Sequence, residues 1–313
     1  MPLLPKEPVG ISPRVDCVFR ALLADPNHVE RLVDFLNAVL QRPSPIMTVQ
    51  LRNPIQPSEF IDDGQIVVDV IATDASGAVF QVEMQSWNHA ALKERMLYAW
   101  ATLYKAQLEK GDRYTELRPV VAIWLLDENV FRGVTAFHHR FKVRDEKGGL
   151  ELSSHLELHV LELDRWRHHP DPSAPPGLLG WMRFFTEAET WPEVPPEIDT
   201  PALESAMAVL TDFQTNAARN DLYRSRLDYL RVQNTMVTGL EQALAEKEQA
   251  LAEKEQAMAR EAQAMAEKER AMAEKERAMA REAQALAREA HGLAEKNRLR
   301  ERLLAAGIDP DST

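Results

Sequence analysis

The chain has 313 residues, 45% of them hydrophobic, which is enough to bury the core of one or two ordinary domains. Its net charge is −12, from 37 Lys and Arg against 49 Asp and Glu, and this balance argues against strong non-specific binding to nucleic acid. The single cysteine, Cys17, excludes a disulfide framework and a cysteine-rich zinc site. Because no apolar run is long enough for a signal peptide or a membrane span, we expect a cytoplasmic protein.

The first half of the chain mixes helical and strand patterns. Apolar residues at helical spacing predict two helices over 14–41, separated near Pro26, and another over 89–110 that ends at Gly111. The proline-rich residues 42–64 predict a loop. Short apolar and β-branched runs predict four strands, over 66–72, 79–85, 119–126 and 155–163.

The last part of the chain is different in kind. Residues 167–201 are proline-rich with a short helix near 178–185, and residues 203–235 are predicted to be helical. From Ala243 to Arg298 a seven-residue repeat predicts one long helix that could pair as a coiled coil. A coiled coil needs two apolar positions in every seven residues where its helices meet. Leu or Met fills only one of these positions here, and the other is mostly Glu or Ala. We therefore expect weak self-association through residues 243–298, or pairing with a partner helix that has a better seam.

Two of the predicted strands, 66–72 and 79–85, are joined by a turn signal and should form a hairpin. If Asp69 pairs with Glu83, then Ile71 faces Gln81, and Gln85 points to the same face as Glu83. Apolar residues then fill the opposite face, namely Val68, Val70, Val82 and Met84. A slip of one residue would separate the two carboxylates, because successive side chains in a strand point to opposite faces.

Two carboxylates on one face of an otherwise apolar hairpin are costly unless they are paired with other groups or bind a metal ion. Their hard oxygen atoms suit Mg²⁺, which can polarise a phosphodiester and lower the pKa of a bound water. Gln85 could orient that water or contact a phosphate oxygen, but it cannot act as a general base. The spacing alone favours a solvated face of an edge hairpin, because the pattern is short and has many chance matches.

A longer set of ordered motifs resembles a known family. Over roughly residues 12–165 the chain is similar to the recombination-promoting nuclease/putative transposase family of PD-(D/E)XK nucleases. The motifs that carry the resemblance are Val15–Arg20, Ile66–Val70, Val82–Gln85, Arg95–Tyr98, Leu103–Tyr104, Gln107–Leu108, Gly111–Tyr114 and Leu117–Ile123.

The resemblance implies an α/β fold, a mixed sheet flanked by helices, and a metal-dependent DNA endonuclease linked to recombination or mobile elements. It makes Asp69 the motif aspartate and Glu83 the second acidic metal ligand. It also puts Gln85 where the broader superfamily usually has Lys, and Asp16 at an auxiliary position on the N-terminal helix. Mg²⁺ is the implied cofactor and DNA the implied partner.

Other residues carry weaker functional hypotheses. Arg95 and Tyr98 lie on the polar stripe of the helix 89–110, where they could contact phosphate or simply form a solvated face. Six histidines are interpreted as surface or structural residues, namely His138, His139, His155, His159, His168 and His169. Cys17 is interpreted as a core residue rather than a nucleophile.

Three segments follow from these patterns: a nuclease-like core over 12–165, a helical extension with a proline-rich linker over 166–240, and the heptad-repeat helix over 241–300. The rival to the enzyme is a catalytically inactive nuclease fold that serves as a protein-interaction module through its C-terminal helix. The acidic composition and the Gln85 replacement favour this rival, whereas the intact set of Asp69, Glu83 and Gln85 favours the enzyme.

Overall fold

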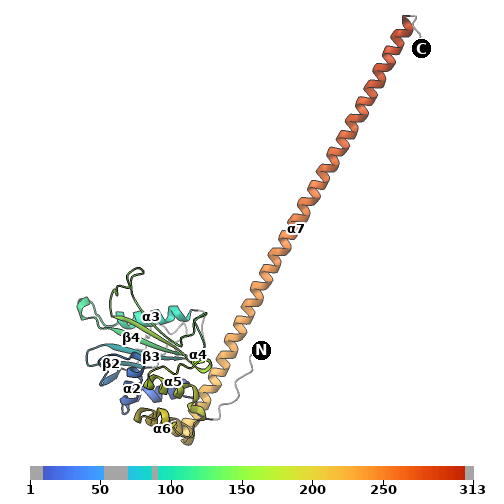
Figure 1. Cartoon of the computed structure of the whole chain (residues 1–313). Coiled ribbons are helices and arrows are strands. Elements are labelled where there is room, and N and C mark those ends of the chain that lie inside the picture. The colour runs from blue at the N-terminus through green and yellow to red at the C-terminus, as the bar shows by residue number, and fades with distance from the viewer. Residues whose placement is uncertain (1–9, 53–69, 87–90, 307–313) are drawn as a thin grey trace. The chain divides into compact units, whose positions relative to one another are not determined.

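The computed structural model describes residues 10–52, 70–86 and 91–306. The chain divides into two units, Met1–Asn234 and Thr235–Thr313, and each is considered by itself. The first unit, called the body below, is built on a mixed sheet with helices on both faces (Figure 1). This architecture confirms the predicted α/β fold, and the second unit consists of the continuation of one long helix.

The sheet has six strands in the order β1-β2-β3-β4-β6-β5. The parallel pairs are β3 with β4 and β4 with β6, and the other neighbours are antiparallel. The strands are β1 Val49–Arg52, β2 Val70–Asp74, β3 Val79–Gln85, β4 Val120–Leu126, β5 His138–Lys142 and β6 Leu156–Glu162. β4 lies in the middle and every one of its side chains is buried, which agrees with its continuous apolar sequence.

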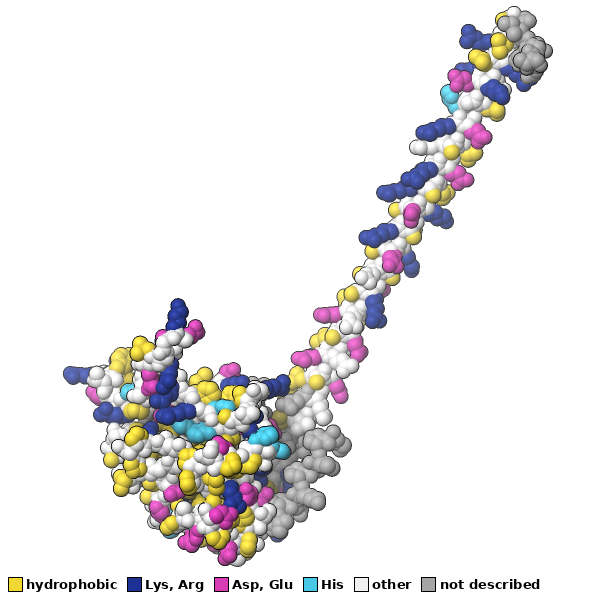
Figure 2. Space-filling view, viewed as in Figure 1, with side chains coloured by type: hydrophobic (Ala, Val, Ile, Leu, Met, Phe, Trp, Pro, Cys, Tyr) yellow, Lys and Arg dark blue, Asp and Glu magenta, His cyan; other side chains and the backbone are white. Residues whose placement is uncertain are grey.

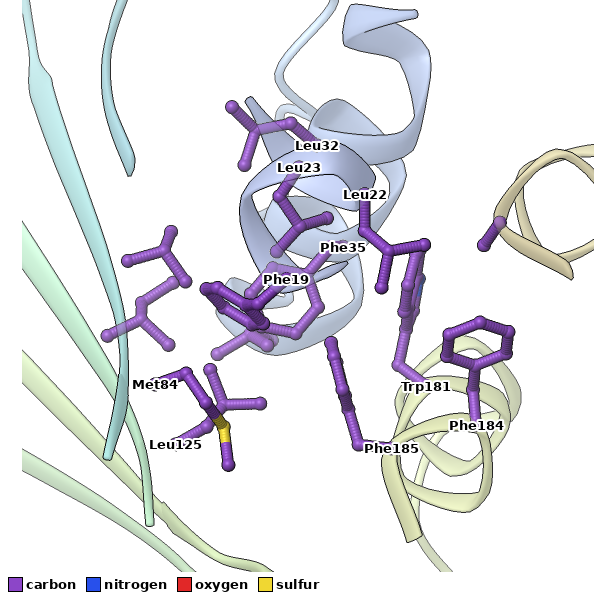
Figure 3. Close-up of a cluster of buried hydrophobic side chains, with 14 of the residues drawn as sticks. Phe19, Leu22, Leu23, Leu32, Phe35, Met84, Leu125, Trp181, Phe184 and Phe185 are labelled. Atoms are coloured by element: carbon purple, nitrogen blue, oxygen red, sulfur yellow. The ribbon is translucent and has the colours of Figure 1, made fainter. Parts of the chain in front are cut away.

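One face of the sheet packs against most of the helices of the body. These are α1 Asp16–Leu23, α2 Val29–Leu40, α4 Leu163–His168, α5 Pro176–Glu187 and α6 Pro201–Thr215. Their aromatic side chains form the centre of the main core, where Phe35 meets Trp181 at 5.5 Å and Phe185 at 5.8 Å between ring centroids (Figure 3). Residues beyond 165 therefore contribute to the same core as the sheet, and Leu178, Phe184 and Leu210 belong to it as well.

The other face of the sheet is covered by α3, Leu92–Lys105. Leu92, Met96 and Ala99 of this helix pack on Trp124 and Leu126 of β4. A second contact, near the start of β4, joins Leu103 to Ile71 and Val79. The face under α3 is thus apolar at both ends, and the polar side chains of β3 lie on this same face.

Helix α3 ends earlier than the predicted 89–110 because the following residues are tied to the start of β4. Gln107 accepts the backbone N–H of Arg118 at 2.8 Å and donates to the carbonyl oxygen of the same residue at 3.1 Å. Gly111, predicted as the helix cap, lies in this connection with φ of 111°. The prediction of the helix was correct, but its predicted C-terminus was wrong.

Two short strands were not predicted. β1 falls inside the expected loop 42–64, and β5 has the polar sequence His-His-Arg-Phe-Lys. Both are edge strands, where one side of the backbone needs no partner and the apolar pattern of a buried strand is absent. The helical stretch 203–235 is also interrupted, because Asn216 is extended between α6 and α7 Ala217–Ala305.

The start of α7 belongs to the body. The Tyr223 hydroxyl, on a side chain that is 4% exposed, accepts the backbone N–H of Ser12 at 3.0 Å. Leu227 and Leu230 pack against the main core. The predicted helix over the heptad repeats is confirmed, since residues 243–298 are helical throughout.

Candidate active site

The hairpin of β2 and β3 has the predicted register in the part that the structure describes. Ile71 pairs with Gln81, and Val70 pairs with Val82. Asp69 lies outside the described residues, as does the predicted pairing of Val67 with Gln85. The predicted strand 66–72 is therefore described only from Val70 onward.

Alternation along β3 separates its side chains onto two faces. Val82 and Met84 belong to the main core, together with Val70 from β2, as predicted. Gln81, Glu83 and Gln85 occupy the intervening positions, so they share the face that α3 covers. Val68, predicted on the core face, lies outside the described residues.

Glu83 carries the carboxylate of β3, and only 2% of its surface is exposed. Its Oε1 accepts a hydrogen bond from Nε2 of Gln81 at 2.9 Å, and it lies beside Trp124 in the parallel pairing of β3 with β4. Because the amide nitrogen of Gln81 donates to Glu83, the amide oxygen remains available to accept a hydrogen bond from another group. That oxygen and the Trp124 indole Nε1 are buried and have no hydrogen-bond partner among the described residues.

Gln85 lies at the carboxyl end of β3 and is linked to α3. Its Oε1 accepts a hydrogen bond from Nη1 of Arg95 at 3.2 Å. The Arg95 guanidinium carbon lies 5.8 Å from the centre of the Trp124 ring, within the range of a cation–π contact. Arg95 thus bridges the ring beside Glu83 and the amide of Gln85. Tyr98, one turn further along α3, is 48% exposed.

The oxygen atoms at this site fit a hard divalent cation better than a soft one. Glu83 and Gln85 offer carboxylate and amide oxygen, and the orphaned Gln81 oxygen lies beside Glu83. The described residues contain no group of three or more His, Cys, Asp or Glu side chains that could hold a metal ion. The second carboxylate of the predicted pair, Asp69, lies outside this set.

Asp16 has contacts of another kind. It is the first residue of α1, its Oδ1 accepts the backbone N–H of Cys17 at 2.8 Å, and its carboxylate is paired with the Arg226 guanidinium from α7. This ion pair ties α1 to the start of α7. Burial, and then the charge of Asp16, raise the pKa of the adjacent Cys17 thiol to about 11, which agrees with Cys17 being a packing residue rather than a nucleophile.

The sequence did not reveal a second polar cluster, at the β5–β6 edge. The rings of His138 and His159 are joined by a hydrogen bond of 2.7 Å between Nε2 and Nδ1, and Nε2 of His159 lies 2.9 Å from Oε1 of Glu157. Arg140 lies 2.5 Å and Arg42 3.7 Å from the same carboxylate. Glu157 and His159 are two residues apart on one strand, so their shared face was readable, but His138 joins them only through the unpredicted strand β5.

Burial controls the protonation of this cluster. It lowers the pKa of His138 to about 4, with a further contribution from the neighbouring His159, and it also lowers the pKa of His159. Burial alone would raise the pKa of Glu157, but the His159 hydrogen bond, the charge that His159 carries once it is protonated at low pH, and the charges of Arg140 and Arg42 outweigh it and lower that pKa to about 2. The cluster is therefore a neutral histidine pair held by one carboxylate.

Three more of the six histidines, His139, His155 and His168, have structural partners. Nδ1 of His155 lies 2.9 Å from the Tyr104 hydroxyl, and His168 interacts with the Asp164 carbonyl oxygen at 2.8 Å. The His139 ring packs on Phe131 with centroids 4.7 Å apart. Glu162, fully buried at the end of β6, accepts the backbone N–H groups of Val130 and Phe131 at 2.6 and 2.9 Å and so shapes the loop that leads to β5.

Comparison with known proteins agrees with this architecture. Within the described part of the chain, no helix combines the length and apolar character needed to cross a membrane. The searches of curated proteins and of solved structures find no match to the chain. The family model for PD-(D/E)XK nuclease family transposases matches residues 13–239, from just before α1 through the start of α7. This match covers more than half of the sequence and includes Asp69, Glu83 and Gln85. The chain therefore belongs to the PD-(D/E)XK nuclease family transposases, a family of nucleases linked to mobile elements.

Proposed function

We propose that this protein is a divalent-metal-dependent DNA endonuclease, linked to recombination or mobile elements, with Asp69, Glu83 and Gln85 at its active site. The observation that carries the proposal is the burial of Glu83. A carboxylate that is 2% exposed in the middle of a sheet is expensive to keep unless partners or a cation compensate its charge. The family resemblance also assigns the second acidic metal ligand to the position of Glu83 on β3.

The register of the hairpin supports a shared site. Ile71 opposes Gln81, so continuing the same antiparallel pairing by two residues would set Asp69 opposite Glu83. Opposite residues of an antiparallel pair have Cβ atoms about 5 Å apart, close enough for two carboxylates to share one ion. Asp69 and Glu83 would hold Mg²⁺, which when bound would polarise the scissile phosphodiester and lower the pKa of a water.

The remaining roles follow from the polar side chains around Glu83. The Gln81 amide orients the Glu83 carboxylate by donating to Oε1. Gln85 positions the attacking water or a phosphate oxygen through its amide, and Arg95 fixes the orientation of that amide. Arg95 and Tyr98 contact backbone phosphate on the α3 side. Asp16 acts only as an auxiliary residue, since its carboxylate is paired with Arg226.

A second function, an inactive nuclease fold that serves as an interaction module, is favoured by the acidic composition of the chain and by one feature of the site. Gln85 stands where the broader superfamily usually has Lys, and an amide cannot take a proton from water. Under this alternative the protein binds no divalent metal at Glu83 and cleaves no DNA. The two functions therefore differ in a direct assay.

The test separates binding from cleavage. DNA binding is measured by fluorescence anisotropy with a labelled duplex in EDTA, and cleavage is measured on supercoiled plasmid in Mg²⁺. Glu83→Gln should lose cleavage by roughly a hundredfold or more while its duplex affinity stays within about twofold. Glu94→Gln, on the exposed side of α3, is the matched control and should cleave as wild type does. Equal cleavage by wild type and Glu83→Gln would exclude Glu83 from the chemistry.

A further inference from the structure

Helix α7 exposes one large apolar side chain in every heptad of the unit that begins at Thr235. These side chains are between 52% and 72% exposed, and Figure 2 shows hydrophobic side chains recurring along the helix. They are Leu244, Leu251, Met258, Met265, Met272, Met279, Leu286 and Leu293. Alanine precedes and follows each of them except Leu293, which Gly292 precedes. A strict spacing of seven residues keeps such a row facing one partner when two helices supercoil.

The charges of the repeats do little to support the helix alone. Residues 241–300 contain one pair of opposite charges four residues apart, Arg270 and Glu274. Opposite charges three residues apart add three pairs, namely Glu267–Arg270, Glu274–Arg277 and Glu295–Arg298. A long helix that stands alone in water usually carries many such pairs. The apolar row is therefore the main source of stability available to this part of α7, and it needs a partner.

The residues at heptad position a, the second position where paired helices meet, favour one direction of pairing. With the Leu and Met residues at heptad position d, position a between residues 248 and 297 is filled by Glu248, Glu255, Ala262, Glu269, Glu276, Ala283, Ala290 and Asn297. A parallel, in-register pair puts each of the four glutamates against its own copy. An antiparallel pair puts position a against position d of the partner, so no glutamate meets another in the seam. Like charges in a seam are the device that excludes a wrong orientation.

Charge at the two ends of the repeats favours the same direction. Residues 241–255 carry five Glu and two Lys, a net charge of −3. Residues 288–302 carry five Arg and Lys against three Glu, a net charge of +2. An antiparallel pair brings these stretches together, whereas a parallel pair brings each next to its own copy.

We propose that residues 241–302 of α7 bind the same segment of a second copy of this chain in antiparallel orientation, centred between Arg270 and Ala271, where position a of each helix faces position d of the other. This pairing does not depend on nuclease chemistry. Glutamate at half of the a positions keeps the association modest and dependent on concentration, which agrees with the weak self-association expected from the sequence. The flanking alanines allow the two helices to approach closely.

Energy transfer between fluorophores on full-length protein tests the orientation. The native cysteine is replaced by Cys17→Ser, and single labelling sites are made by Ala252→Cys or Ala287→Cys, which flank the apolar row. Sites 252 and 287 are 35 residues apart on the helix, or roughly 50 Å at 1.5 Å per residue. Antiparallel pairing predicts efficient transfer from donor at 252 to acceptor at 287, and little transfer between two copies labelled at 252.

Each other result overturns the proposal. Efficient transfer between two copies labelled at 252 would mean parallel pairing, and no transfer in either mixture over a concentration series would mean that α7 does not pair with itself. Met265→Glu with Met272→Glu should abolish the 252-to-287 transfer. Gln256→Glu with Gln263→Glu adds the same charge away from the apolar row, and this control should keep most of the transfer. Equal loss in both double variants would also contradict the proposal.

Discussion

Arg95 donates a hydrogen bond from its Nη1 to Oε1 of Gln85 at 3.2 Å, and so connects helix α3 to the end of strand β3. The same guanidinium lies over the ring of Trp124, the neighbour of Glu83 on β4. One side chain of α3 therefore orients the Gln85 amide and covers the residue beside the buried carboxylate. The predicted phosphate-binding residue is part of the candidate site itself.

Gln85→Ala should slow plasmid nicking by roughly ten- to a hundredfold without unfolding the protein, because an orienting group rather than a ligand is lost. Arg95→Lys should produce part of the same loss, since an ammonium group cannot reproduce the planar donor set of guanidinium. The initial rate of nicking in Mg²⁺ measures both. Lys105→Gln, at the exposed last residue of α3, should leave the rate unchanged. A wild-type rate for Gln85→Ala would remove Gln85 from the site.

Variants of Asp16 and Arg226 test whether Asp16 assists cleavage or only stabilises the fold. Both residues are about one-third exposed, so their ion pair should contribute about 1 kcal/mol or less to stability. Asp16→Asn and Arg226→Gln should thus lower the free energy of unfolding by similar small amounts, as measured by urea denaturation. If Asp16 has its predicted auxiliary role, only Asp16→Asn should also reduce cleavage. Equal cleavage in the two variants would make Asp16 purely structural.

The histidine pair at the β5–β6 edge should make stability depend on pH. His138 has a pKa of about 4 in the folded chain and about 6.5 when unfolded, so the unfolded state takes up the proton first as the pH falls. Stability from the neutral pair is therefore complete above pH 6.5 and is lost between about pH 6.5 and 4. The charged groups that face it are Glu157, Arg42, Arg140 and His139.

Thermal unfolding at pH 7.5 and at pH 5.0 measures this dependence. Wild type should lose on the order of 1–3 kcal/mol between the two values. His138→Gln should be less stable at pH 7.5, because the bond to His159 changes, but should lose less on acidification. Glu157 titrates mainly below this window, since its pKa is about 2 in the folded chain. A variant with the same pH dependence as wild type would show that another group is responsible.

Much of the fold was predictable because it rests on local apolar patterns. The buried runs of β3 and β4 and the helical spacing of α1 and α2 have the patterns of fully buried strands and half-buried helices, and the structure confirms them. β1 and β5 escaped prediction because edge strands need only backbone partners, and those partners are distant in sequence. The end of α3 depends on Gln107 meeting Arg118, a contact that no local pattern encodes.

The candidate site was predictable in part for similar reasons. Alternation on β3 was enough to place Gln81, Glu83 and Gln85 on one face, and the register of Ile71 against Gln81 followed from assuming that Asp69 pairs with Glu83 across the turn. The bond between Arg95 and Gln85 needed the packing of α3 on the sheet. The pairing of Asp16 with Arg226 needed α7 to return to α1 across more than 200 residues, which no spacing in the sequence reveals.

Truncation should distinguish the two roles of α7. A chain that ends after Thr238 keeps Tyr223, Arg226 and Leu230 and should unfold at nearly the wild-type temperature, because the apolar row of the repeats is exposed. A chain that ends at Asn216 loses the buried Tyr223 and its bond to Ser12, and should be less stable by a few kcal/mol. Calorimetry and sedimentation compare the two. Aggregation of the longer truncation would show that the repeats support the body.

Asp69 and Glu83 share the proposed metal site, so nicking of supercoiled plasmid by Asp69→Ala is the decisive measurement. Purified wild type and variant are compared in Mg²⁺ and in EDTA, with circular dichroism to show that both are folded. A shared metal site predicts nicking by wild type that needs Mg²⁺, and a loss of roughly a hundredfold or more in Asp69→Ala with native secondary structure. Equal, Mg²⁺-dependent nicking by wild type and Asp69→Ala would contradict it.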